Sequence, residues 1–193
     1  MTKLTRADLM SLETYSVERP DFRAKVIKHK IPRKIALGSN ATLYFEDRLT
    51  MQYQIQEMLR IEKIFEAEGI QEELDTYNAL IPDGSNWKAT FMLEFPDENE
   101  RKQQLAKLIG IEKQTWAQVA GFDKVYPICN EDLERETEEK TSSVHFMRFE
   151  LTPAMVAAIH EGGQVTMGIE HVEYTQQTEL GEESRTSLAA DLG

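Results

Sequence analysis

The chain has 193 residues, which is typical of one domain and long enough to bury a core without disulfides or a structural metal. Its single cysteine, Cys129, excludes an internal disulfide, and no stretch approaches the ~20 apolar residues of a membrane-spanning helix. With a net charge of −12 and no apolar segment of a signal peptide at its start, we expect a cytoplasmic protein.

The charge is unevenly distributed along the sequence. Residues 1–37 contain nine Lys and Arg against four Asp and Glu, whereas residues 38–193 contain 13 against 30. Nucleic-acid-binding domains usually carry a basic surface, so nucleic-acid binding by this acidic body is unlikely. A basic patch containing Arg23, Lys28 and Lys30 could bind phosphate, or it could dock on the acidic body or remain solvated.

The first third of the chain predicts helices and a hairpin. Thr5 followed by Asp8 resembles a capping box at the start of a first helix. Pro20 suits the first turn of a second helix over residues 20–30. Two short strands follow at residues 33–37 and 41–46, and the intervening Gly-Ser-Asn segment favours a turn between them.

A long helix is predicted at residues 48–68. Apolar positions recur at three- and four-residue spacing, which places them on one helical face: Met51, Ile55, Met58, Ile61 or Glu62, and Phe65. Gly69 suits the position after the helix end, and a further helix is expected at residues 70–80.

The remainder alternates between strand and helix patterns. The apolar positions of residues 87–95 repeat every second residue, as in a half-buried strand. The other expected elements are helices at 97–109 and 153–161 and strands at 115–120, 124–129, 143–151 and 164–174. The charge run at 130–140 suits a solvated loop or a surface helix, and the polar composition of 178–193 predicts a disordered tail.

Together these elements predict an α+β fold, with one mainly antiparallel sheet and helices packed on it. No linker divides residues 1–177, which we expect to form a single domain. The common nucleotide-binding, hydrolase and zinc motifs are missing from the sequence, so whether the protein is an enzyme stays open.

Four residues suggest a metal site. His145 and His171 each lie on the apolar side of an expected strand, and both side chains are common metal ligands. Glu57 and Glu62 lie on the long helix, and Glu62 falls near its apolar side. These residues, with Cys129 as a further candidate, could bind a divalent metal ion. Alternatively, the histidines are core residues satisfied by hydrogen bonds, and Glu62 pairs with an arginine of the basic N-terminal helices or reaches water.

Three segments carry a family resemblance. Residues 44–60, 71–78 and 140–151 resemble a bacterial family of proteins of unknown function, the domain of unknown function numbered 3501, and the similarity extends over about residues 3–174. The resemblance assigns no catalytic residue. Because members of this family are often encoded near rubrerythrin-like and iron–sulfur proteins, it implies an accessory role in redox or oxidative-stress physiology with such partners.

Two hypotheses follow. The first is an accessory or binding protein that acts through its acidic surface and its basic N-terminal element. The alternative is a metal-binding protein or metal-dependent enzyme that uses His145, His171, Glu57 and Glu62.

Overall fold

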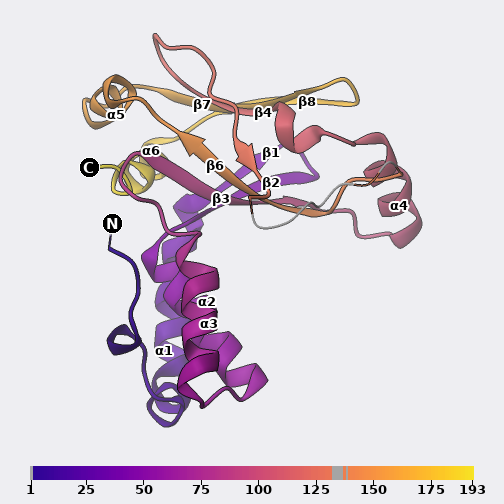
Figure 1. The fold of residues 1–193 in the computed structure, drawn as a ribbon. Helices are drawn as coiled ribbons and strands as arrows, with labels where there is room; N and C mark the ends of the chain where they lie inside the picture. Colours follow the sequence, from indigo (N-terminus) through magenta and orange to yellow (C-terminus); the bar gives the residue numbers. More distant parts are fainter. Residues whose placement is uncertain (1, 132–136, 138) are drawn as a thin grey trace.

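The computed structural model describes residues 2–131, 137 and 139–193. A helical arm projects from one end of a body that contains two antiparallel sheets (Figure 1). The α+β class expected from the sequence is confirmed, but the strands form two sheets where one was expected. Successive strand patterns do not encode which strands pair, and this explains the difference.

The helical arm contains three helices: α1 (Leu12–Lys30), α2 (Arg48–Glu62) and α3 (Ala67–Asn78). A 3-10 turn, η1 (Arg6–Asp8), precedes them. The apolar face of α2 and the facing side of α3 form a small core with the start of the chain; its buried members are Leu4, Met51, Ile55, Leu59, Leu74 and Ile81.

Two helix boundaries differ from the prediction. The helix expected at residues 48–68 ends at Glu62, because Lys63 adopts a left-handed conformation with φ 53° that stops α2, and Gly69 lies inside α3. Pro20 lies within α1 and does not begin a new helix. The position is exposed, so the one backbone hydrogen bond that proline removes can be replaced by water.

The larger sheet has the strand order β1-β2-β3-β6-β5, and all of its neighbouring strands are antiparallel. The strands are β1 (Lys34–Leu37), β2 (Ala41–Glu46), β3 (Asn86–Leu93), β5 (Ile128–Cys129) and β6 (Val144–Glu150). The turn of η2 (Ile31–Arg33) connects α1 to β1, and the predicted β1–β2 hairpin is confirmed.

The smaller sheet has the order β4-β7-β8, with β4 (Thr115–Val119), β7 (Val165–His171) and β8 (Tyr174–Glu179). Three helical segments border the two sheets: α4 (Glu98–Lys107), η3 (Ile111–Gln114) and α5 (Pro153–His160).

One face of each sheet contributes to a continuous hydrophobic core. Trp87 and Phe149 of the larger sheet and Met167 of the smaller one are buried in it. Because side chains alternate along a strand, the opposite face of the larger sheet carries more polar residues, among them Lys88 and Arg148. That second face meets the helical arm at a corner.

The C-terminal segment is ordered, contrary to the prediction for residues 178–193. Strand β8 continues to Glu179, and the helix α6 (Glu182–Ala189) follows. Leu188 and Leu192 are buried in the main core, and the Trp87 indole Nε1–H donates to the Leu188 carbonyl over 2.9 Å. Two leucines in a polar segment are too few to predict burial from the sequence. In the fold they are buried, and this burial orders the segment. The solvated loop or surface helix predicted for residues 130–140 lies largely outside the described residues.

Candidate functional site

The two predicted histidine ligands are held by hydrogen bonds in the protein interior. His145 on β6 is fully buried, with its Nδ1 3.0 Å from the Asn130 side-chain amide and its Nε2 3.0 Å from the Ser142 carbonyl. His171 at the end of β7 donates from Nε2 to the Ile109 carbonyl over 3.1 Å, and its Nδ1 accepts from the Glu173 amide. Both nitrogens of each ring are therefore already engaged.

Glu57 and Glu62 lie in the helical arm, far from those partners in the fold. Within the described residues, no three His, Cys, Asp or Glu side chains gather in an arrangement that could hold a metal ion. The histidines belong to different sheets, and Glu62 is exposed near the end of α2. The structure thus does not bring the predicted ligands together.

An arginine of the N-terminal helix pairs with Glu57, and not with Glu62 as one of the sequence-based alternatives expected. The Arg19 guanidinium donates to both carboxylate oxygens of Glu57, over 2.7 and 2.9 Å, and the Tyr15 hydroxyl donates over 2.6 Å. The hydrogen bonds from Arg19 lower the pKa of Glu57 to about 2, with further contributions from Tyr15 and Arg60. This cluster fastens α1 to α2.

The depressed pKa of Glu57 predicts acid sensitivity. A carboxylate whose folded-state pKa lies below its ordinary value stabilises the fold above that ordinary value, here 4.5, and the contribution is lost as pH falls toward 2. We expect Glu57→Gln to lower the free energy of unfolding at pH 6 by about 2–3 kcal/mol and by much less at pH 2.5. Urea denaturation at the two pH values measures this. Glu62→Gln on the same helix is the control, and an equal loss at both pH values would contradict the prediction.

Cys129 does not have the environment of a reactive thiol. Burial, followed by the nearby charge of Glu112, raises the pKa of Cys129 to about 12. The protonated thiol is a poor nucleophile and a poor metal ligand at neutral pH.

The basic N-terminal segment divides into two groups. Arg19, His29 and Arg33 form ion pairs with carboxylates of the body and of α2, as one sequence-based alternative expected. Arg23 and Lys28 are exposed on α1 and Lys30 is half-buried, so these three cations lie at the surface.

The structure contains a site that the sequence alone did not indicate. A cavity of about 630 Å³ lies in the corner between the end of α3 and the polar face of the larger sheet. We call it the corner pocket. It is lined by Lys3, by Thr76, Tyr77, Asn78, Ala79, Leu80, Ile81 and Asp83 of the α3–β3 segment, by Lys88 of β3, and by Glu131, Phe146, Met147 and Arg148.

Two cations face each other across neighbouring strands in this pocket. The register of β3 and β6 places Lys88 directly opposite Arg148, and like charges in such a position repel. The Arg148 guanidinium is neutralised by Glu131, with contacts of 2.8 and 2.7 Å, and by a short contact to Glu150.

Lys88 has no such direct contact, although the carboxylates of Asp83, Glu131 and Glu150 oppose the lowering of its pKa from a distance. In the described part of the chain its ammonium makes no hydrogen bond or ion pair, and its other cross-strand neighbour, Glu46, accepts a hydrogen bond from Thr90 instead. Burial, and then the positive charge of Arg148, lower the pKa of Lys88. A half-buried, unpaired lysine in a pocket is energetically unfavourable, which is common at functional sites.

The opposite wall of the pocket is fixed by the N-terminal segment. The Asn78 side chain at the end of α3 accepts from the Leu4 backbone N–H over 2.7 Å and donates to the Leu4 carbonyl over 2.9 Å. Leu4 is buried, and this pair of bonds places Lys3 at the rim of the pocket. Leu80, Ile81 and Phe146 supply an apolar surface beside the charged groups.

Comparison with known proteins gives the family of the chain. The model of the family described as "Protein of unknown function (DUF3501)" matches residues 3–192. The chain belongs to the DUF3501 family. The family match thus reaches beyond the residues that carried the resemblance and includes the C-terminal helix α6.

A solved structure has the same fold as this DUF3501 protein. It is the crystal structure of a novel protein of unknown function from Burkholderia pseudomallei K96243, with 47% sequence identity and a TM-score of 0.94, and the match covers 100% of both chains. The search of curated proteins found no match. Among the described residues, no helix has the length and apolar character needed to cross a membrane.

Proposed function

We propose that this DUF3501 protein is a binding protein whose corner pocket captures a small molecule with an acidic group and an apolar body. The volume of about 630 Å³ lies within the range of small-molecule sites, which are largely apolar with a few placed polar groups. Among the residues that the structure describes, the lining contains three cations, Lys3, Lys88 and Arg148, against the two carboxylates of Asp83 and Glu131. This excess is notable in a chain of net charge −12.

The observation that carries the proposal is the half-buried ammonium of Lys88, which makes no hydrogen bond or ion pair with any residue that the structure describes. A carboxylate or phosphate at this position would supply a counter-charge in direct contact and offset the cost of partial desolvation. The apolar body of the ligand would then contact Leu80, Ile81 and Phe146. Arg148 is already occupied by Glu131 and Glu150, which leaves Lys88 on the sheet, with Lys3 at the rim, to bind the anion.

The family resemblance adds a finer hypothesis about the partner. The genomic association with rubrerythrin-like and iron–sulfur proteins supports an accessory role beside such a protein. Copurification of the untagged chain with a rubrerythrin-like protein of the same organism would support this, and absence of any complex between the two purified proteins would count against it.

The pocket proposal is tested by binding of simple acids. We expect octanoate, phenylacetate or phenyl phosphate to raise the melting temperature, with the neutral amides octanamide and phenylacetamide having little effect. Lys88→Met keeps the apolar stem but removes the charge, and it should weaken binding of the best acid by about tenfold or more, measured by isothermal titration calorimetry.

Lys34→Met is the matched control, because Lys34 lies on β1 of the same sheet but does not line the pocket. This variant should bind the acid as the wild type does. Equal binding by Lys88→Met, or equal stabilisation by acids and amides, would overturn the proposal.

A further inference from the structure

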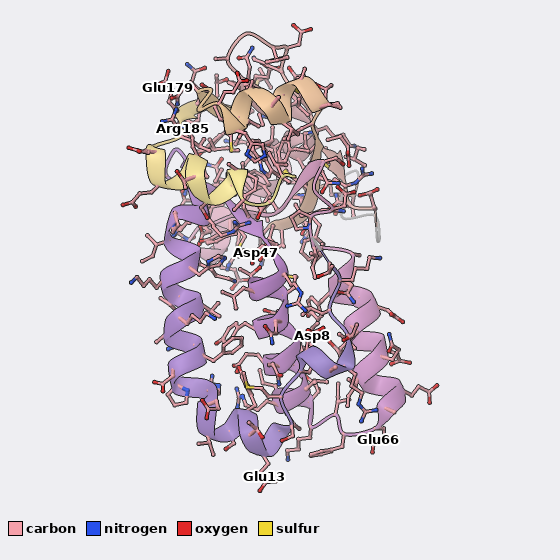
Figure 2. The ribbon with its side chains drawn as sticks, turned by 90° about the vertical axis from the view of Figure 1, so that its left-hand side faces the viewer. Asp8, Glu13, Asp47, Glu66, Glu179 and Arg185 are labelled. Atoms are coloured by element: carbon pink, nitrogen blue, oxygen red, sulfur yellow. The ribbon has the colours of Figure 1, made fainter. Side chains whose placement is uncertain are left out.

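An apolar stripe runs along the outer side of α1 without covering any part of the described core. Val17, Ile27 and Ile31, the last just past the end of the helix, are 76%, 50% and 65% exposed, and Pro20 and Ala24 between them are also exposed. The successive spacings of three and four residues place all five on one face, which is the pattern of a helix that packs against another helix. Figure 2 shows α1 along the outer edge of the helical arm, with Glu13 near its free end.

The charges that flank this stripe change sign along the helix. Glu18 and Asp21 lie beside its first half, whereas Lys25 and Lys28 lie beside its second half, and all four are exposed. The helical positions of these residues place them on the same flank of the stripe, because they are three or four residues apart from one to the next. This flank is therefore complementary to the same flank of a reversed copy of the helix.

We infer that α1 pairs with α1 of a second copy of this chain in antiparallel orientation, around a two-fold axis near Ala24. This arrangement places Val17 opposite Ile31 of the second copy, and Glu18 and Asp21 opposite its Lys28 and Lys25. The small side chain at the centre allows the two helices to approach closely.

The size of the apolar stripe limits the expected affinity of the dimer. A helix of 19 residues is about 28 Å long, so one helix pair buries less than the ~800 Å² per partner of a standard interface. We therefore expect a dimer with a dissociation constant in the micromolar range. No residue of α1 lines the corner pocket, so dimer formation leaves that pocket open.

The first test is the oligomeric state in solution. Sedimentation velocity of the full chain over a wide concentration range should give a monomer–dimer equilibrium for the wild type. Ile27→Glu should weaken association at least tenfold. Val172→Glu is the matched control, because Val172 is 88% exposed in the β7–β8 turn, and it should dimerise like the wild type. Circular dichroism checks that both variants are folded.

The second test uses the charges. E18K/D21K and K25E/K28E should each be monomeric, because every cross-helix pair becomes repulsive. An equimolar mixture of the two should form a heterodimer, because the pairs become attractive again.

The third test determines the relative orientation of the two α1 helices. In a Cys129→Ser background, Val17→Cys and Ile31→Cys variants should form an intermolecular disulfide when mixed, and neither should crosslink well alone. A wild type that stays monomeric at all concentrations, or a dimer that Ile27→Glu does not weaken, overturns the inference. Crosslinking of Val17→Cys alone would overturn the antiparallel arrangement.

Discussion

Deletion of residues 182–193 is expected to remove most of the free energy of unfolding. Leu188 and Leu192 are buried in the main core, and loss of each costs about 2–5 kcal/mol. The deletion also removes Asp191, which pairs with the buried Arg33, and an unpaired buried charge costs about 3–5 kcal/mol. The total, about 7 kcal/mol or more, approaches the whole stability of an ordinary domain.

The measurement is urea denaturation followed by tryptophan fluorescence, since Trp87 loses its hydrogen bond to the Leu188 carbonyl in the deletion. Thr186→Ala, at an exposed position of α6, is the control and should change the free energy of unfolding by less than about 0.5 kcal/mol. A truncated chain with near-native stability would show that α6 is an appendage and not part of the core.

Arg33→Met is expected to cost about 3–5 kcal/mol, the largest loss that we predict for a single substitution. The guanidinium is only 2% exposed and bonds to Asp191 over 2.6 and 3.2 Å and to the backbone carbonyls of Phe45, Glu46 and Ser187. It also forms an ion pair with Asp47. Methionine fills part of the volume but leaves two buried carboxylates without this cation.

The pH dependence of this loss has a defined sign. Burial raises the pKa of Asp191 to about 6 even though Arg33 opposes the shift, so removal of Arg33 should raise the pKa of Asp191 further. An acid with a raised folded-state pKa binds its proton more readily in the folded state, and stability then falls as pH rises. Arg33→Met should therefore lose more stability at pH 8 than at pH 5, measured by urea denaturation.

Arg60→Met is the comparison for Arg33→Met. Arg60 is 41% exposed and pairs with Glu57 on the same helix, so its loss should cost less than about 1 kcal/mol. Similar losses for the two arginine variants would mean that the network around Arg33 adds no specific stability.

These experiments converge on the junction between the helical arm and the sheets. Arg33 joins η2, the start of α2 and the C-terminal segment, and His29 contacts Asp47 over 2.5 Å at the same place. The junction also fixes how the arm meets the sheet (Figure 1). It thereby positions the two walls of the corner pocket. Variants that loosen the junction should consequently be checked for acid binding as well as for stability.

The sequence by itself determined the local structure of this protein. The period of two in residues 87–95 and the turn chemistry after residue 37 predicted β3 and the β1–β2 hairpin, because these patterns depend on neighbours along the chain. The helical spacing of apolar residues predicted α2 and α3, but it placed the boundary between them several residues too late. The left-handed conformation of Lys63 that ends α2 has no glycine to signal it.

Only the tertiary structure decided the pairing of strands, the order of the C-terminal segment and the candidate site. Lys88 was visible in the sequence simply as a polar residue of an alternating strand. Its significance depends on Arg148, 60 residues later in the sequence, which the pairing of β3 with β6 places opposite Lys88. It depends also on the end of α3, which closes the pocket. Burial, charge pairing and pocket shape arise from residues brought together across the chain, and no local pattern encodes those contacts.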